Sequence, residues 1–382
     1  MSSINKQVSC LTLTSPLFSL SLGRLLEGIM DARIMSAIMH DKAVEGILFF
    51  TPENIRYLTG FSGSEGYLLA LKEENLLLVD SRYITQASEE TTGCRVALLE
   101  KRLKGLKDYS APLGLQRLGF EAQGISVARF EQLQKEMKGI ELVPITEELE
   151  RLRGLKTDNE ITAIKQAVAI AEAAWKKAVE MTRPGVREDA VALELEYRMR
   201  AGGSEGIAFD PLVASGPRSA LPHAKPTARQ LATGDLLLFD FGARFSGYCC
   251  DESCTVVLGQ ATKEQRRIYS IVKDAHDRAI DHVRPGIKLA EIDAAAREYI
   301  TAAGQGANFG HGTGHGIGLA VHEWPTIGRD ALETAAEGMV FTIEPGIYIP
   351  GWGGVRIEDT VSVTADGCEV LTTISKDLMS IP

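Results

Sequence analysis

Apolar and polar positions follow different patterns in the two parts of the chain. Between residues 46 and 145, the short apolar runs GILFF, YLLAL and NLLLVD are interleaved with the helix-like segments SRYITQASEE and SVARFEQLQKEM. Apolar runs of this length are typical of strands that are covered on both faces. Strands that alternate with helices predict an α/β domain here. The glycine-rich GFSGSEG at 60–66 lacks the Lys-Ser/Thr of a phosphate loop, so we interpret it as a plain loop.

A charged connector, RLRGLKT at 151–157, separates this part from the next. Thr157 and Glu160 have the spacing of a capping box, which predicts the start of a helix. Apolar residues then recur every three or four positions, as in an amphipathic helix with one buried face. That stripe consists of Ile161, Ile164, Val168, Trp175 and Val179. We therefore expect a first domain over residues 30–150 and a second over 151–382.

Residues 1–29 are expected to form a disordered extension. The first 23 residues are rich in Ser and Thr, contain a single Lys, and have their apolar stretch interrupted by Ser, Thr and Pro. A secretory signal has a basic start and a continuous apolar run. A signal peptide is therefore the less favoured interpretation.

The second domain contains a degenerate internal repeat. AVEMTRPGVREDAVALELEYRMRAGG at 178–203 resembles AIDHVRPGIKLAEIDAAAREYITAAG at 279–304, and both read helix, Arg-Pro-Gly, helix. The similarity continues in GDLLLFDFG, which begins at Gly234, and GMVFTIEPG, which begins at Gly338. Such a repeat predicts two similar halves that meet at a pseudo-twofold seam.

Each half supplies two acids at comparable positions. Asp240 and Glu344 each follow the first glycine of their apolar run by six residues, and Asp251 and Glu358 each lie just before an apolar strand. The spacing within each pair predicts a hairpin. A lone acid in a buried strand is costly unless it is paired or binds a metal. We therefore interpret these acids as metal ligands rather than as unrelated surface residues.

Three of the seven histidines lie in HGTGHGIGLAVHEWP at 311–325, namely His311, His315 and His322. Glycine offers no side chain for packing and costs conformational entropy. We interpret this stretch as backbone bent closely around a ligand, with imidazoles directed at it. His223, in SALPHAKP, lies on the corresponding approach in the first half.

Four converging carboxylates repel one another unless cations lie between them. Three or more carboxylates with one neutral imidazole suit two divalent ions about 3.5–4 Å apart. The oxygen-rich ligand set favours Mn²⁺, with Co²⁺, Fe²⁺ or Zn²⁺ as alternatives.

The composition limits the classes of partner. The 382 residues are 45% hydrophobic and 24% charged, which suits a large globular protein of two domains. The net charge of −10 argues against nucleic acid and anionic membrane as partners. No apolar run reaches the roughly 20 residues that span a bilayer. We expect Cys249, Cys250 and Cys254 to be small buried residues in the reducing cytoplasm rather than part of a disulfide framework.

These segments resemble the metallopeptidase family with the pita-bread fold, which includes methionine aminopeptidase, Xaa-Pro aminopeptidase and Xaa-Pro dipeptidase (prolidase). FDFGARFSGYCCD resembles its two-aspartate segment, GHGTGHGIGLAVHEWP its histidine segment, and TIEPGIY and GGVRIEDT its glutamate segments. SGPRSALPHAKP, NIRYLTGFSGSEG and DSRYITQA are similar to the Xaa-Pro-cleaving branch. The resemblance implies an α+β protein with a creatinase/prolidase-like α/β domain at 30–150 and a catalytic pita-bread domain at 151–382.

The resemblance also implies the residues of a site with two metal ions. Asp240 would bind one ion, and Asp251 and Glu358 would bridge both. The five implied ligands are Asp240, Asp251, His315, Glu344 and Glu358. The implied catalytic residues are His223, His322 and Glu344, and the implied substrate-binding residues are His311 and Arg356.

One departure from the family pattern concerns the second aspartate. Relatives often read Asp-x-Thr-Arg-Thr there, whereas this chain reads Asp251-Glu252-Ser253-Cys254-Thr255. The ligand is retained, but an arginine that supports it is absent.

The implied mechanism is attack by a metal-bridging hydroxide on the scissile carbonyl. Glu344 would transfer the proton toward the leaving nitrogen, and His322 and His223 would stabilise the tetrahedral intermediate.

We expect a Xaa-Pro aminopeptidase that removes the residue before proline from peptides with proline at the second position. The resemblance further implies a homodimer. A Xaa-Pro dipeptidase is the alternative, because Arg356 alone does not decide whether the site reads a substrate C-terminal carboxylate. A creatinase-like hydrolase or a binding module on the same fold is more remote, because both lack the metal ligands that this chain retains.

Overall fold

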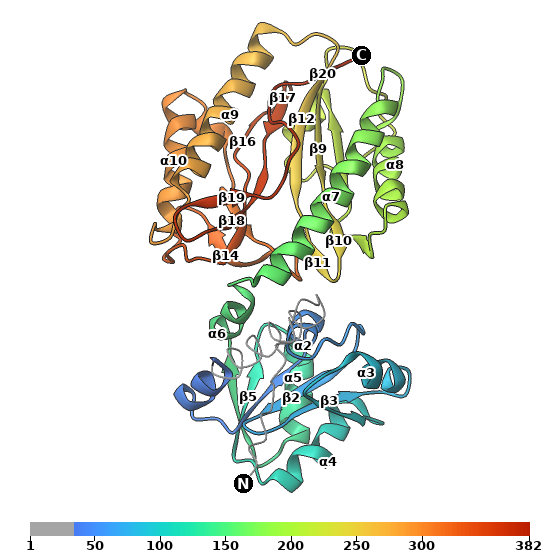
Figure 1. The fold of residues 1–382 in the computed structure, drawn as a ribbon, viewed down its shortest axis with the longest axis vertical. Coiled ribbons are helices and arrows are strands. Elements are labelled where there is room, and N and C mark those ends of the chain that lie inside the picture. Colours follow the sequence, from blue (N-terminus) through green and yellow to red (C-terminus); the bar gives the residue numbers. More distant parts are fainter. Residues whose placement is uncertain (1–33) are drawn as a thin grey trace, which may run out of the picture. The chain divides into compact units, whose positions relative to one another are not determined.

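The computed structural model describes residues 34–382, so the expectation of a disordered extension at 1–29 lies outside the described residues. The chain divides into two compact units, Met1–Thr146 and Glu147–Pro382. Figure 1 shows that both units combine helices with sheets, as expected for an α+β protein.

The first unit is built on one mixed sheet of six strands. They are β1 (Gly46–Phe49), β2 (Tyr67–Leu71), β3 (Asn75–Val79), β4 (Arg95–Leu98), β5 (Arg117–Glu121) and β6 (Glu141–Ile145). Their order is β4-β3-β2-β1-β5-β6. Strand β2 pairs antiparallel with both β1 and β3, and the other neighbouring strands pair parallel to each other. The three apolar runs identified in the sequence form β1, β2 and β3, which are almost entirely buried.

Helices connect these strands, as the sequence predicted. They are α2 (Pro52–Thr59), α3 (Ile84–Glu90), α4 (Leu106–Ser110) and α5 (Val127–Glu136), with short 3₁₀ turns η1 (Arg102–Gly105) and η2 (Ala111–Leu113). Residues 34–41 are also helical, and 60–66 contain neither helix nor strand.

The second unit begins with α6 (Glu147–Glu150) and η3 (Arg151–Arg153), followed by the long helix α7 (Asp158–Met181). The capping box of Thr157 and Glu160 is formed at its start. Trp175 is 3% exposed and packs in the core against Phe239 and Phe241.

The remaining elements of the first half are α8 (Glu188–Ala201), β7 (Gly206–Ile207), β8 (Leu212–Ser215), η4 (Gly216–Ala220), β9 (Leu236–Phe241), β10 (Ala243–Phe245), β11 (Tyr248–Cys249) and β12 (Glu252–Leu258). Those of the second half are α9 (Lys263–His282), α10 (Leu289–Ala302), η5 (Gly306–Asn308), β13 (Gly314–Gly316), β14 (Glu323–Ile327), β15 (Val340–Ile343), β16 (Gly346–Ile349), β17 (Gly353–Arg356), β18 (Asp359–Val363), β19 (Cys368–Val370) and β20 (Ser380–Ile381).

The two halves share one order of elements, which confirms the internal repeat. Two helices lead into three antiparallel strands, β8-β9-β12 in the first half and β13-β15-β18 in the second. Figure 1 shows the pair α7 and α8 on one side of these strands and the pair α9 and α10 on the other.

Strand register brings the acids of each half together. Asp240 in β9 lies opposite Ser253 in β12, two residues from Asp251. Ile343 in β15 lies opposite Asp359 in β18, and Glu344 and Glu358 are their neighbours toward the seam. The predicted hairpins are therefore formed, each with a smaller hairpin, β10–β11 or β16–β17, in its connection.

Two other expectations concern burial and membranes. Cys249, Cys250 and Cys254 are buried, as predicted. Within residues 34–382, none of the helices combines the length and the apolar character that crossing a bilayer requires.

Candidate metal centre

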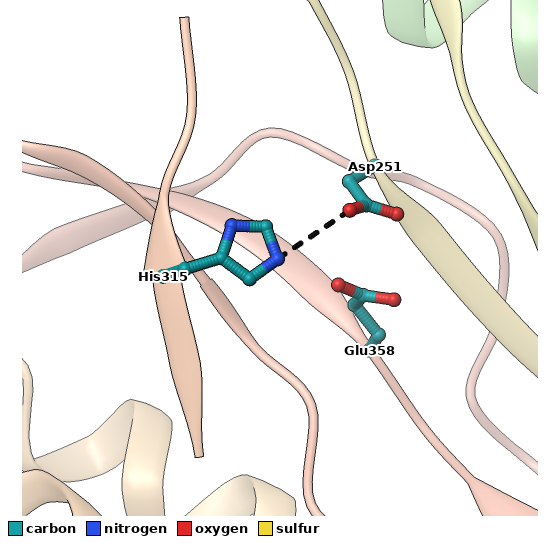
Figure 2. A group of neighbouring side chains, drawn as sticks. All are labelled: Asp251, His315 and Glu358. Carbon is teal, nitrogen blue, oxygen red and sulfur yellow. Dashed lines mark ion pairs between the residues drawn. The ribbon is translucent and has the colours of Figure 1, made fainter. Parts of the chain in front are cut away.

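Side chains from both halves meet at the seam. Asp251 directly precedes β12, His315 lies in β13, and Glu358 directly precedes β18. Figure 2 shows these three side chains pointing toward one another, and one ligand atom of each lies within 4.8 Å of the others. The Nε2 atom of His315 is 3.6 Å from Oδ2 of Asp251 and 3.5 Å from Oε1 of Glu344. The four side chains therefore surround a common point.

The fourth acid, Asp240, is held at the same place by Arg356. Nη2 of Arg356 donates to Oδ2 of Asp240. Nε of Arg356 donates to the hydroxyl of Ser253 at 2.8 Å, and that hydroxyl donates to Oε2 of Glu358 at 2.7 Å. One guanidinium group thus links an acid of the first half to an acid of the second.

Burial and mutual repulsion raise the pKa values of Asp251, Glu344 and Glu358. Burial is the largest cause for Asp251 and Glu358, whose pKa values lie well above the ordinary range, and the neighbouring carboxylates add to it. Burial also raises the pKa of Glu344 to about 7, although the charge of Arg356 opposes the shift. A cluster of this kind is stabilised by a bound cation.

The pKa of His315 is shifted in the opposite direction, below its ordinary value. Burial, together with the neighbouring His322, lowers the pKa of His315 to about 4. The imidazole is therefore neutral at physiological pH, which is the form that binds a metal.

Three carboxylate oxygens of the cluster fit the role of metal ligands. Oδ1 of Asp240, Oδ1 of Asp251 and Oε1 of Glu358 are buried, and none has a hydrogen-bond partner among residues 34–382. Buried polar atoms normally have such a partner. Unpartnered carboxylate oxygens beside a neutral imidazole suit divalent cations, because these ions prefer oxygen and nitrogen ligands.

The remaining histidines surround this cluster. His322 is exposed, and the centroid of its ring lies 4.2 Å from that of His315. His311 lies deeper, with Nε2 3.0 Å from the hydroxyl of Tyr348. His223 is exposed in the loop after η4. Burial is the main reason that the pKa values of His311 and His322 are lowered, and the nearby His223 adds to both shifts.

Arg356, which the resemblance implies as a substrate-binding residue, lies within the cluster of acids. Its side chain is 3% exposed. Besides Asp240 and Ser253, it contacts the hydroxyl of Tyr348 at 3.1 Å and the carbonyl oxygen of Pro222 at 3.0 Å. Through these contacts Arg356 orders the acids and connects them to Tyr348, and its role in binding substrate stays a prediction.

The glycines beside His315 have a different structural role from the one inferred from the sequence, which was close approach of the backbone to a ligand. A Cβ atom on Gly314 would overlap the backbone oxygen of Thr342 in β15, and one on Gly316 would overlap the backbone of Trp324 in β14. Both glycines therefore allow close approach of neighbouring strands rather than of a ligand. They fix the strand that carries His315.

Comparison with known families agrees with this arrangement. The model of metallopeptidase family M24 matches residues 162–365, more than half of the chain. The chain belongs to metallopeptidase family M24. In addition, the model of the creatinase/prolidase N-terminal domain matches residues 34–155.

Several relatives within the M24 family are similar over nearly their whole length. A Xaa-Pro dipeptidase from Pyrococcus horikoshii is 36% identical over 354 residues, which cover 92% of this chain and 99% of the relative. The structure of a Xaa-Pro dipeptidase from Bacillus anthracis superposes with a TM-score of 0.89 at 37% identity, covering 93% of this chain and 100% of that one. An X-Pro aminopeptidase from Thermotoga maritima gives a TM-score of 0.83 at 37% identity, covering 89% and 98%.

Sequence reasoning missed several residues of this M24 site. Tyr348 connects His311 to Arg356, and Ser253 connects Arg356 to Glu358. A hydroxyl in a strand carries no pattern of its own, so these partners emerge only from the fold. Ser253 could have been noticed because it lies two residues after Asp251, at the start of a strand that continues into the apolar run Val256–Leu258.

Proposed function

We propose that this protein is a dinuclear-metal Xaa-Pro dipeptidase, which hydrolyses the bond before the proline of a dipeptide. The observation that carries the proposal is the convergence of four acids and His315 at the seam of an M24 domain. The dipeptide specificity in this proposal is supported by the similar proteins, most of which are named as Xaa-Pro dipeptidases or prolidases.

The sequence alone favoured a Xaa-Pro aminopeptidase, and the comparisons favour the alternative, the dipeptidase. Aminopeptidase activity stays as the second candidate, because the X-Pro aminopeptidase from Thermotoga maritima is also 37% identical over most of its length. The two activities differ only in whether the peptide continues after proline. Both use peptides with proline at the second position.

The proposed ligands are Asp240, Asp251, His315, Glu344 and Glu358, with Mn²⁺ as the preferred ion and Co²⁺, Zn²⁺ or Fe²⁺ as alternatives. Two bound divalent ions would polarise the scissile carbonyl and lower the pKa of a coordinated water. The protein's own contribution includes holding two of these ligands, Asp240 and Glu358, in place through Arg356 and Ser253.

The other side chains would handle protons and substrate. Glu344, whose Oε1 lies 3.5 Å from Nε2 of His315 at the centre of the cluster, would accept a proton from the nucleophile and deliver it to the leaving nitrogen. The exposed His322 and His223 would donate hydrogen bonds to the oxygen of the tetrahedral intermediate. His311 would contact the substrate beside Tyr348, which also connects it to Arg356.

The test is hydrolysis of Ala-Pro and Ala-Pro-Ala by metal-stripped protein, before and after Mn²⁺ is restored. We expect cleavage of Ala-Pro alone, and only with the metal. Cleavage of both peptides would make the protein an aminopeptidase, and cleavage of neither would refute Xaa-Pro specificity. Asp251→Asn, which lacks one ligand charge, is the control for metal dependence. A cytoplasmic location and a homodimer remain predictions that cell fractionation and analytical ultracentrifugation would check.

A further inference from the structure

A second group of buried charges lies behind the metal centre. Successive side chains of an extended strand point to opposite faces. Asp251 and Glu358 point toward His315, so their sequence neighbours Glu252 and Asp359 point to the other side. Glu252 and Asp359 are 1% and 7% exposed, respectively, and the two strands that carry them belong to different halves of the unit.

Lys376 is a cation that these two carboxylates share. Its ammonium group forms an ion pair with Oε1 of Glu252 and lies 3.1 Å from Oδ1 of Asp359. The lysine side chain is 6% exposed. Its backbone is held in turn, because the hydroxyl of Tyr269 donates to the carbonyl oxygen of Lys376 at 3.0 Å.

Other groups complete the surroundings of this lysine. Nε2 of the buried His276, on α9, lies 3.1 Å from Oδ2 of Asp359. The thiol of Cys254 is 3.9 Å from Nζ of Lys376. Cys254 is the position where the family pattern implies an arginine, so in this chain a cation reaches the same region from the C-terminal segment.

The ion pairs join two strands that carry proposed metal ligands. Without Lys376, two buried carboxylates would lose the cation that both contact, and they would separate. Separation would move Glu252 and Asp359, and with them the adjoining Asp251 and Glu358. The two strands are also linked on the metal side through Arg356 and Ser253, and by hydrogen bonds such as that from Thr360 Oγ1 to the carbonyl oxygen of Asp251 at 2.8 Å.

We propose that Lys376 is a positioning residue of the metal centre, which sets the distance between Asp251 and Glu358 by binding the side chains that follow them. The proposal rests on the proposed dinuclear site. Groups that support metal ligands from behind typically change metal affinity by about 10–100-fold when they are removed. The loss should affect the binding of two metal ions together, because Asp251 and Glu358 are the ligands that the two ions would share.

The test compares four variants with the wild type. Lys376→Met removes the cation, and Lys376→Arg keeps it. The double variant Glu252→Gln with Lys376→Met removes a charge of each sign, so it leaves no additional uncompensated charge in the interior and keeps the test interpretable if the single variant does not fold. Lys165→Met is the matched control, because Lys165 pairs with Glu369 on the surface at 2.7 Å.

The measurements are circular dichroism for folding, stepwise Mn²⁺ affinities by calorimetry on metal-stripped protein, and the electron paramagnetic resonance signal of the coupled Mn²⁺ pair. We expect the second Mn²⁺ to bind about 10–100-fold more weakly in folded Lys376→Met and in the double variant, with an altered signal from the Mn²⁺ pair. Lys376→Arg and Lys165→Met should behave as wild type. A purely structural role would change stability without moving the pair signal.

Two outcomes would overturn the inference. One is wild-type Mn²⁺ affinity and pair signal in the folded double variant, and the other is failure of Lys376→Arg to restore them. If the wild type itself binds only one Mn²⁺ or none, the proposed dinuclear site fails, and the inference falls with it. The wild-type titration therefore separates the two failures.

Discussion

The most direct test of the site's electrostatics is to neutralise one acid in the absence of metal. Replacing Glu344 by Gln keeps the size of the side chain and removes its charge. Burial raises the pKa of Glu344 from 4.5 to about 7, so the folded protein binds this proton more tightly than the unfolded chain does. The stabilisation that the folded protein gains from this proton is fully present below the pKa of Glu344 in the unfolded chain, and it is lost as the pH rises through the folded pKa of about 7.

The magnitude follows from that shift. Each pKa unit corresponds to about 1.4 kcal/mol, so ionising Glu344 at high pH costs the folded metal-free protein roughly 3 kcal/mol. At about pH 5 the side chain is still protonated in the folded state, and most of that cost is absent. Glu344→Gln should therefore raise the Tm of the metal-free protein by roughly 6–12 °C at about pH 8, and by much less at about pH 5.

The assay is thermal unfolding of metal-stripped protein at both pH values. Glu180→Gln is the matched control, because Glu180 is 64% exposed and pairs with Lys177 at the surface. The difference between wild type and Glu344→Gln should widen as the pH rises, while the control stays level with the wild type. Equal Tm values for wild type and Glu344→Gln at about pH 8 would refute the reasoning that ionised Glu344 destabilises the folded metal-free protein.

Three further outcomes are expected. His322→Ala should lower kcat by roughly 100-fold or more while metal content stays unchanged, as for loss of a donor to the oxyanion; near-normal kcat would remove His322 from the mechanism. Mn²⁺ binding should release protons and tighten as the pH rises, because burial holds the pKa values of Asp251 and Glu358 high without metal. Calorimetry in buffers of different ionisation enthalpy measures the number of protons released. A Mn²⁺ affinity that falls as the pH rises would contradict this expectation. Mn²⁺ at about 100 times its Kd should stabilise the wild type by about 2.7 kcal/mol and Asp251→Asn far less, as unfolding with and without metal would report; equal stabilisation of both would exclude Asp251 as a ligand.

The sequence predicted the elements whose signals are local. The capping box of Thr157 and Glu160 and the apolar runs of the first unit needed only neighbouring residues to be recognised. The repeat predicted the seam, and Asp240 and Glu344 drew attention because they interrupt apolar strands.

Contacts between distant segments could not be predicted in this way. Lys376 lies in a polar stretch near the C-terminus that has the appearance of an exposed loop, yet the fold buries it against Glu252 and Asp359. The glycines around His315 were assigned to a ligand because the sequence does not reveal which strand passes beside them. Substrate length is equally hidden, since recognition of a group beyond proline depends on the shape of the site rather than on any short motif.

The division of the ligands between two halves has a consequence for how activity arises during folding. Ser253 and Glu358, which share a hydrogen bond at the centre, are 105 residues apart in sequence. Contacts of such long range form late, because a large loop must close before they contribute. A half-folded chain would hold two of the acids and would lack the partners that complete the site. Hydrolytic activity would therefore emerge only once both halves have folded and met at the seam.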